Sequence, residues 1–195
     1  MKNIVFDLGG VLFARDKTRC AEEFGDFFAF VRAEEMPRFW EEYDRGTSTM
    51  EEVIRTLCRI NDCPPERCRH YLQRSIDLQE PVKPTEQLVR ELKAAGYKLY
   101  VLSNMSREFI AFLRRFPVYG LFDGEVVSCE VGTVKPEPRI YEILLERYRL
   151  DPAETLFVDD RQANIDAAEG LGIRGHLFDY HNPAATCDAL RRQLL

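Results

Sequence analysis

Short apolar runs alternate with helical patterns along most of this chain. Residues 3–6 form a short β-prone segment whose apolar run, residues 4–6, stops at Asp7, as a buried parallel strand does before a turn. Similar β-prone runs recur at residues 98–102, 125–127, 155–158 and 176–178. We expect these segments to be the strands of one sheet.

Between the later runs, apolar residues recur at spacings of three and four, which predicts amphipathic helices. Gly96 stands where a C-terminal helix cap belongs, and Pro117 ends another such segment. The expected helices span residues 85–95, 107–116, 138–148, 164–171 and 183–194. Because strands and helices alternate, the predicted fold class is α/β, with a doubly wound parallel sheet.

One segment, from about residue 16 to residue 78, breaks this alternation, with no credible strand and several helical stretches. Thr49 and Glu52 have the spacing of a capping box, and Pro64 and Pro65 begin another helix. The first part is crowded with aromatic residues, which is typical of the core of a small helical bundle. We therefore predict a core of residues 1–15 and 79–195, with an all-helical cap, residues 16–78, inserted in it. Residues 81–84 would be a stiff connector back to the sheet.

Composition narrows the possible functions. The chain has 195 residues, with 27 Lys and Arg against 33 Asp and Glu, a formal net charge of −6. It lacks the concentrated positive charge of a general nucleic-acid binder. No apolar run approaches the ~18 residues that span a bilayer, and the first residues do not resemble a signal peptide. We expect a cytoplasmic protein, monomeric, with no nucleic-acid or membrane partner.

The six cysteines, at positions 20, 58, 63, 68, 129 and 187, are interpreted as free and mostly inert thiols. A cytoplasmic chain keeps its thiols reduced. Cys58, Cys63, Cys68 and His70 lie close enough in sequence to suggest zinc. Their spacing lacks the C-x2-C knuckle that presents two thiolates on one tight turn, so structural zinc is not expected.

Polar residues stand at or near the ends of four of the predicted strands. In a doubly wound sheet, ligands bind outside the carboxyl ends of the strands, at the point where the strand order reverses. These side chains are therefore expected to converge on one crevice. They are Asp7 after the first strand, Ser103 and Asn104 after the second, Lys135 near the third, and Asp159 and Asp160 after the fourth.

Each of these residues alone has an ordinary structural explanation, such as a turn residue, a solvated loop lysine or a helix cap. Together, in this order and each at a strand end, they resemble the haloacid dehalogenase-like (HAD) hydrolase superfamily, in its phosphatase branch. The resemblance covers essentially the whole chain. It implies a Rossmann-like core with a helical cap, and Mg²⁺-dependent hydrolysis of a small phosphorylated metabolite.

The same resemblance implies roles around the nucleophile. Asp7 would attack phosphorus and form an aspartyl-phosphate, which splits one difficult displacement into two. Mg²⁺ would be held by Asp7, the backbone carbonyl of Gly9, and Asp160. Asp159 would act through a metal-bound water, and Asn164 falls where many relatives carry another acid that supports this site.

Phosphate binding is assigned in the same way. Ser103 and Asn104 would donate to phosphate oxygens, and the catalytic Lys135 would supply positive charge to both the phosphate and the nucleophile. The candidates that face the site are Arg15 and Asp16, just after the first strand, and residues 43–46 in the cap. The expected substrate contacts are Asp16 and Arg45, although Asp16 equally fits a helix cap and Arg45 a solvated turn.

Gly9 departs from the family pattern, because most phosphatases of the family have a second Asp there. That Asp protonates the leaving oxygen and later activates water, and losing it typically forfeits ~10²–10⁴-fold in rate. One explanation is a substrate with a better leaving group, since residues 7–10 resemble a subgroup that includes sugar-phosphate phosphatases. The others are a haloacid dehalogenase, a weak metal- and phosphoester-binding module, or a backbone that requires glycine. Dehalogenases lack the acidic pair at the fourth strand, so we expect a phosphatase, acting on a sugar phosphate.

Overall fold

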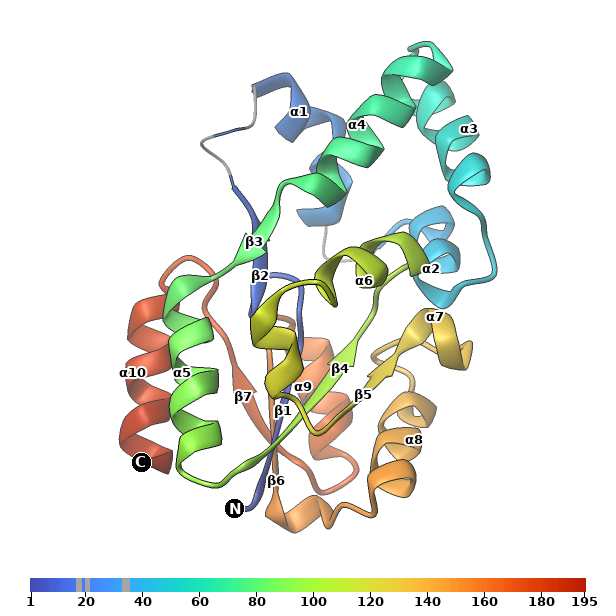
Figure 1. Cartoon of the computed structure of the whole chain (residues 1–195). Helices are drawn as coiled ribbons and strands as arrows, with labels where there is room; N and C mark the ends of the chain where they lie inside the picture. The colour runs from blue at the N-terminus through green and yellow to red at the C-terminus, as the bar shows by residue number, and fades with distance from the viewer. Residues whose placement is uncertain (17–18, 20–21, 33–35) are drawn as a thin grey trace.

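The computed structural model describes residues 1–16, 19, 22–32 and 36–195. A parallel sheet in the order β5-β4-β1-β6-β7 forms its centre (Figure 1). Earlier crossovers run to one side of β1 and later ones to the other, so the strand order reverses beside β1 and the predicted doubly wound sheet is confirmed. The strands are β1 (Asn3–Phe6), β4 (Lys98–Ser103), β5 (Gly124–Val127), β6 (Thr155–Asp159) and β7 (Arg174–Leu177).

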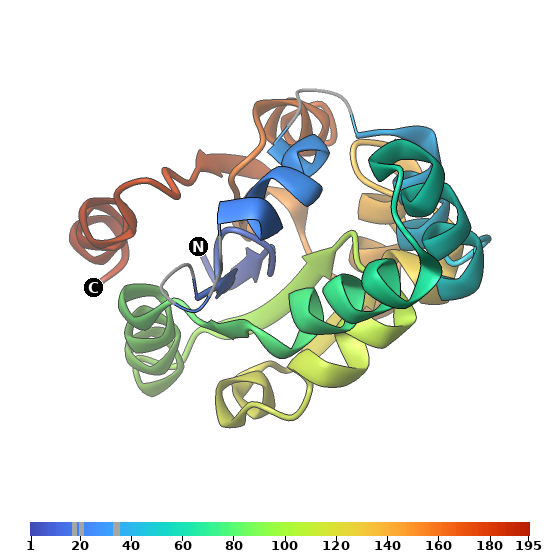
Figure 2. The ribbon, with the colours of Figure 1, turned by 90° about the horizontal axis from the view of Figure 1, so that it is seen from above.

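Helices cover both faces of the sheet (Figures 1 and 2). Successive residues of a strand point to opposite faces, so Phe6 packs with α5 and α10 while Val5 packs with α8 and α9. The central strand is thus buried on both sides, which explains its continuous apolar run. The core helices are α5 (Lys83–Ala94), α6 (Arg107–Leu113), α7 (Ser128–Val131), α8 (Pro138–Tyr148), α9 (Gln162–Glu169) and α10 (Pro183–Leu194).

The remaining helices lie over the carboxyl ends of the strands (Figure 1). They are α1 (Glu22–Phe27), η2 (Ala29–Arg32), α2 (Arg38–Arg45), α3 (Met50–Asn61) and α4 (Pro65–Asp77). Their apolar side chains form a cluster of their own, rich in aromatic rings, which Phe109 of α6 joins. The predicted capping box is confirmed, since Thr49 and Glu52 exchange side-chain and backbone hydrogen bonds. The exact boundaries of the cap stay a prediction.

The structure differs from the sequence-based expectation at several element ends. The expected connector begins as a strand, β3 (Gln79–Pro81), which pairs antiparallel with β2 (Phe13–Arg15). Neither segment alternates clearly between apolar and polar residues, so the sequence pattern did not predict these two strands. Helix α5 begins at Lys83, two residues before the expected start. Pro84 is accommodated in the first turn, because a backbone N–H there has no partner within the helix. Helix α6 ends before Pro117, which opens the 3-10 turn η3 (Pro117–Leu121), and Asp151 caps another, η4 (Pro152–Glu154).

Cys58, Cys63, Cys68, Cys129 and Cys187 are free thiols, whereas residue 20 lies outside the described residues. The Sγ atom of Cys68 lies 3.0 Å from that of Cys63 and 3.3 Å from that of Cys58, so Cys68 stands between the other two. Among the described helices, none is long and apolar enough to cross a membrane.

Candidate active site

The polar residues predicted at the strand ends converge, as expected for parallel strands that share one edge. Asp7 follows β1, Ser103 ends β4 and Asp159 ends β6, and these strands are neighbours in the sheet. Lys135 reaches them from the loop between α7 and α8. The cap helices lie above this edge (Figure 1), so the site is positioned between cap and core.

Asp7 is nearly buried, with 7% of its surface exposed. Its Oδ1 accepts a hydrogen bond from Ser103 Oγ at 2.8 Å and lies 2.8 Å from Lys135 Nζ. Burial raises the pKa of Asp7 above its ordinary value, and the attraction of Lys135 only partly offsets this. Both close contacts fall on Oδ1, so neither Ser103 nor Lys135 occupies the other carboxylate oxygen.

Lys135 is a buried cation rather than a solvated loop residue, with 5% of its surface exposed. Its ammonium group has three acceptors to match its three hydrogens: Asp7, Asp159 at 2.6 Å, and the carbonyl of Leu102 at 3.0 Å. Burial alone lowers the pKa of Lys135, but attraction to Asp159 and Asp7 outweighs it, and the net pKa is raised. Lys135 is therefore a fixed positive charge beside Asp7.

Asp159 holds Lys135 in place. It is fully buried, and its Oδ1 accepts hydrogen bonds from the Arg161 backbone N–H at 2.8 Å and from Asn164 Nδ2 at 2.9 Å. The backbone carbonyl of Asn164 in turn accepts from the Tyr141 hydroxyl at 2.9 Å. The other oxygen of Asp159, Oδ2, contacts Lys135, so both carboxylate oxygens have donors from the protein itself. This arrangement suits a residue that positions Lys135.

Asp7, Asp159 and Asp160 each offer an oxygen, and these three atoms lie within 4.8 Å of one another. Within the described part of the chain, no other group of three His, Cys, Asp or Glu residues gathers in this way. Burial, and then repulsion from Asp7 and Asp159, raises the pKa of Asp160 to about 7. A cluster of oxygen ligands whose negative charges repel one another fits a hard divalent cation such as Mg²⁺.

The two glycines after the first strand differ in their constraints. A Cβ atom on Gly9 would meet only the Met105 side chain, at 4.0 Å, and the Gly9 backbone is not in the left-handed region. A Cβ on Gly10 would lie 2.6 Å from Asp160 Oδ2, and Gly10 has a φ of +79°. Glycine is therefore required at Gly10 and not at Gly9, so a backbone need does not explain the missing Asp.

Asn104 joins two loops of the site. Its Nδ2 donates to the Lys135 backbone carbonyl at 2.8 Å, and its Oδ1 accepts from the Lys135 backbone N–H at 2.7 Å. These bonds fix where Lys135 leaves its loop. They use one amide hydrogen of Asn104, so a phosphate contact through the other hydrogen stays a prediction.

The two residues expected to contact substrate from the cap have different surroundings. Arg45 pairs with Glu41 at 2.7 Å and with Glu137 at 2.6 Å, so its guanidinium ties α2 to the loop before α8. A substrate contact would require Arg45 to give up these partners. Asp16 follows β2 directly, is partly buried, and donates its backbone N–H to the carbonyl of Leu78. Its side-chain role stays a prediction.

Sequence reasoning did not identify Ser128, although a serine at the end of a predicted strand was an available signal. Ser128 Oγ accepts the Met105 backbone N–H at 2.9 Å and donates to the backbone carbonyl of Asp44 in α2. One hydroxyl therefore links the loop after β4 to the cap.

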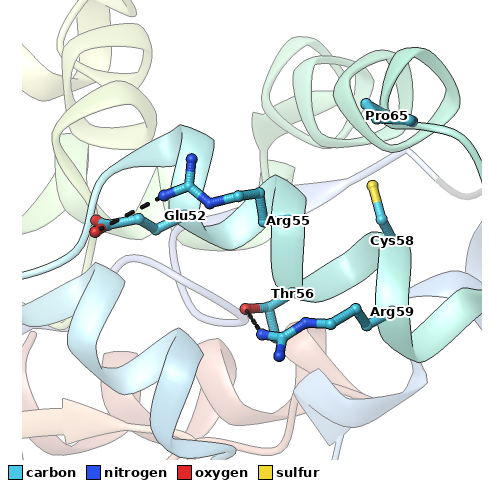
Figure 3. Close-up of a pocket in the computed structure, with 6 residues that line it drawn as sticks. All are labelled: Glu52, Arg55, Thr56, Cys58, Arg59 and Pro65. Atoms are coloured by element: carbon cyan, nitrogen blue, oxygen red, sulfur yellow. Dashed lines mark hydrogen bonds and ion pairs between the residues drawn. The ribbon is translucent and has the colours of Figure 1, made fainter.

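A depression of about 580 Å³ on the cap is separate from this site (Figure 3). Arg55 lies 4.0 Å from Glu52, and Arg59 donates to Thr56 at 3.2 Å, so both arginines are turned onto their own helix. None of the predicted site residues lines it. Its lining residues are Glu52, Arg55, Thr56, Cys58, Arg59 and Pro65.

Comparison with known proteins agrees with this geometry. The sequence model of the haloacid dehalogenase-like hydrolases matches residues 1–172. The chain belongs to this family.

Several relatives of this HAD hydrolase are phosphatases. A sesquiterpene phosphatase of Aspergillus oryzae is 30% identical over 98% of this chain and 95% of its own length. A D-ribitol-5-phosphate phosphatase of Bacteroides thetaiotaomicron is 27% identical over 89% of each chain. A HAD family enzyme of the same bacterium, solved in complex with magnesium and inorganic phosphate, superposes with a TM-score of 0.71 at 25% identity. That match covers 92% of this chain and 95% of the other.

Proposed function

We propose that this HAD hydrolase is a Mg²⁺-dependent phosphatase that hydrolyses a small phosphate monoester through an aspartyl-phosphate on Asp7. The observation that carries the proposal is the buried Asp7 carboxylate, held on one oxygen by Ser103 and Lys135 and placed against Asp159 and Asp160. The phosphatase relatives and the neighbour with bound magnesium and phosphate support it.

Metal binding would fall to Asp7, the backbone carbonyl of Gly9, and Asp160, with Asp159 acting through a water. Mg²⁺, when bound, supplies positive charge that offsets the repulsion between the phosphate and the carboxylates. Asp159 already satisfies Lys135, Arg161 and Asn164, so a less direct role fits it better than direct ligation.

The chain's own residues would carry the chemistry in two displacements. The free oxygen of Asp7 attacks phosphorus, and the bond from phosphorus to the ester oxygen breaks. Lys135 lies beside the attacking carboxylate and offers positive charge to the phosphate oxygens. The Ser103 hydroxyl donates to Asp7 in this structure, and it would turn from Asp7 to donate to a phosphate oxygen. Water then attacks the same phosphorus, which releases inorganic phosphate and regenerates Asp7.

A sugar or polyol phosphate is the proposed substrate, supported by the D-ribitol-5-phosphate phosphatase among the relatives. A second candidate is the phosphate of an apolar alcohol. Met105, the side chain that a Cβ on Gly9 would meet, packs against the apolar clusters of both core and cap, so an apolar side chain borders the site. The sesquiterpene phosphatase relative supports this second candidate.

The test is a hydrolysis screen of sugar 1-phosphates, sugar 6-phosphates, prenyl phosphates and an aryl phosphate, in Mg²⁺ and in EDTA. The proposal expects turnover that disappears in EDTA and returns with Mg²⁺. Hydrolysis of 2-haloacids that ignores EDTA would instead establish a dehalogenase. Tight Mg²⁺ binding with no turnover of any ester would establish a binding module.

A further inference from the structure

An alkyl phosphate leaves as a strongly basic alkoxide, which needs a proton as the bond to phosphorus breaks. Gly9 cannot supply it, and the space beside Gly9 is bordered by the thioether end of Met105, which carries no acidic proton. A proton donor for this reaction must therefore come from another element of the site.

The C-terminal end of α2 is fixed directly over the site loops. The backbone carbonyl of Asp44 accepts the Ser128 hydroxyl, which also accepts the backbone N–H of Met105. Two residues on, Gly46 lies so close to α7 that a Cβ there would be 2.6 Å from the Cys129 carbonyl oxygen. Figure 1 shows α2 and α7 side by side above β5, so Asp44 is held at this junction of cap and core.

The carboxyl of Asp44 is hydrogen-bonded to the loop that follows β4 and interacts with the charges of the site. Asp7, Lys135 and Arg161 act on it electrostatically, and the backbone N–H of Ser106 donates to it. Asp44 as a residue is partly buried. A carboxyl of α2 is thus within electrostatic reach of Asp7 and Lys135 and is bound to the loop after β4.

We propose that Asp44 is the general acid and base of this enzyme, in place of the carboxylate missing at Gly9; the inference rests on the proposed phosphatase activity. In the first step, Asp7 bonds to phosphorus, the bond to the ester oxygen breaks, and the Asp44 proton passes to that oxygen. In the second, water attacks phosphorus and gives its proton to the Asp44 carboxylate, while the bond from phosphorus to Asp7 breaks. The acid is thereby restored for the next turnover.

The protonation equilibrium of Asp44 suits this use. Burial, and then repulsion from Asp7, raises the pKa of Asp44 to about 7, although Arg161 and Lys135 act in the opposite direction. A carboxyl with such a pKa is available in both forms near neutrality, as an acid that becomes a base must be.

Other candidates near α2 are less suited. The Tyr43 hydroxyl donates to Glu108 at 2.8 Å, and burial raises its pKa, so it holds its proton. Arg45 is paired with Glu41 and Glu137. Asp16 is the remaining competitor, because it is the other carboxylate that the sequence places at the entrance to the cap.

The test compares Asp44→Asn, Asp16→Asn and the matched control Glu42→Gln with wild type, all in Mg²⁺. Glu42 is an acid of the same helix, exposed and paired with Arg38. The substrates are 4-nitrophenyl phosphate, whose leaving group needs little protonation, and a sugar 6-phosphate. For Asp44→Asn we expect kcat/KM on the sugar phosphate to fall by ~10²–10⁴-fold. On the aryl ester, one equivalent of nitrophenol should be released quickly, followed by slow turnover with phosphate retained on Asp7, seen by intact-protein mass.

Glu42→Gln should match wild type on both esters. Three outcomes would overturn the role of Asp44 and leave the proposed phosphatase activity intact. They are an equal loss on both esters without a burst, wild-type kinetics in Asp44→Asn, or a burst in Asp16→Asn in place of Asp44→Asn. A wild type inactive on every ester would overturn the proposed function itself. Should Asp44→Asn fail to fold by melting temperature, Asp44→Ser, which also lacks the acid, must show the same burst, and its absence would reject the inference.

Discussion

Gly9 and Gly10 are adjacent residues shortly after Asp7, the proposed nucleophile, and the structure constrains them differently. Because Gly9 has room for a side chain, Gly9→Asp should fold and present a carboxylate near the leaving oxygen. If Asp44 already supplies the proton, this change adds little to wild type. In the Asp44→Asn background it should restore much of the ~10²–10⁴-fold loss on a sugar 6-phosphate. Steady-state kinetics of the single and double variants checks this.

The control for that pair is Gly10→Asp. At this position the left-handed backbone and the 2.6 Å approach to Asp160 leave no place for a Cβ atom, so activity on every ester and the melting temperature should both fall. If Gly9→Asp behaved in the same way as Gly10→Asp, the space that the structure shows beside Gly9 would not be usable.

Asp7 gives a second prediction at the scale of single residues. Asp7→Asn is nearly isosteric and keeps an acceptor for Ser103, but an amide does not attack phosphorus. Turnover should be lost while the circular dichroism spectrum and a cooperative melt persist. In wild type, beryllofluoride should protect a peptide that contains Asp7 from hydrogen exchange. Full activity in Asp7→Asn would rule out the aspartyl-phosphate.

Among the elements, α2 is held by an ion pair between cap and core. Arg45 and Glu137 lie 2.6 Å apart with side chains 22% and 43% exposed, so the pair is partly screened and should contribute no more than about 1 kcal/mol. We expect Arg45→Gln and Glu137→Gln to lower stability by similar, non-additive amounts in a double-mutant cycle of urea melts. A KM raised in Arg45→Gln but not in Glu137→Gln would instead restore the predicted substrate contact.

Elements with strong local patterns were predictable from the sequence, and those defined by contacts were not. The buried runs gave β1, β4 and β6 because strands covered on both faces are continuously apolar. The strand ends then located Asp7 and Ser103. By contrast, β2 and β3 are short and show no clear apolar–polar alternation, and only their mutual pairing makes them strands. The burial of Lys135 and the partners of Arg45 depend on residues distant in sequence, which periodicity does not report.

For the whole molecule, we expect the acidic cluster of Asp7, Asp159 and Asp160 to make the stability of the fold depend on metal binding and on pH. The folded state raises the pKa of Asp160 to about 7, above the ordinary ~3.9 of an unfolded Asp, so the folded protein binds more protons. In the metal-free protein, the contribution of Asp160 to the free energy of unfolding is therefore fully present below about pH 4. It is lost as the pH rises toward 7. In EDTA at pH 8, Asp160→Asn should melt above wild type, and the difference should vanish near pH 4. A wild type that melts above Asp160→Asn in EDTA at pH 8 would contradict the raised pKa of Asp160.

Mg²⁺ should reverse that order. A ligand at 100 times its Kd stabilises the folded state by about 2.7 kcal/mol, so saturating Mg²⁺ should raise the melting temperature of wild type by several degrees. Asp160→Asn should lose most of this increase, because one of the proposed ligands is gone. Glu42→Gln is again the control, since it lies outside the cluster. An increase of the same size in Asp160→Asn would remove Asp160 from the metal site.

The pairing of β2 with β3 has a consequence for how such a protein diversifies. Arg15 lies opposite Gln79 in this ribbon, so the chain leaves the sheet domain and returns to it at adjacent points. Because the two ends of the inserted segment are neighbours, the segment can be exchanged without distorting the backbone of the sheet domain. Replacing residues 16–78 with the corresponding segment of a relative is then a local splice at two peptide bonds. Such chimaeras would keep Asp7, Ser103 and Lys135 unchanged while transplanting whatever the foreign segment recognises.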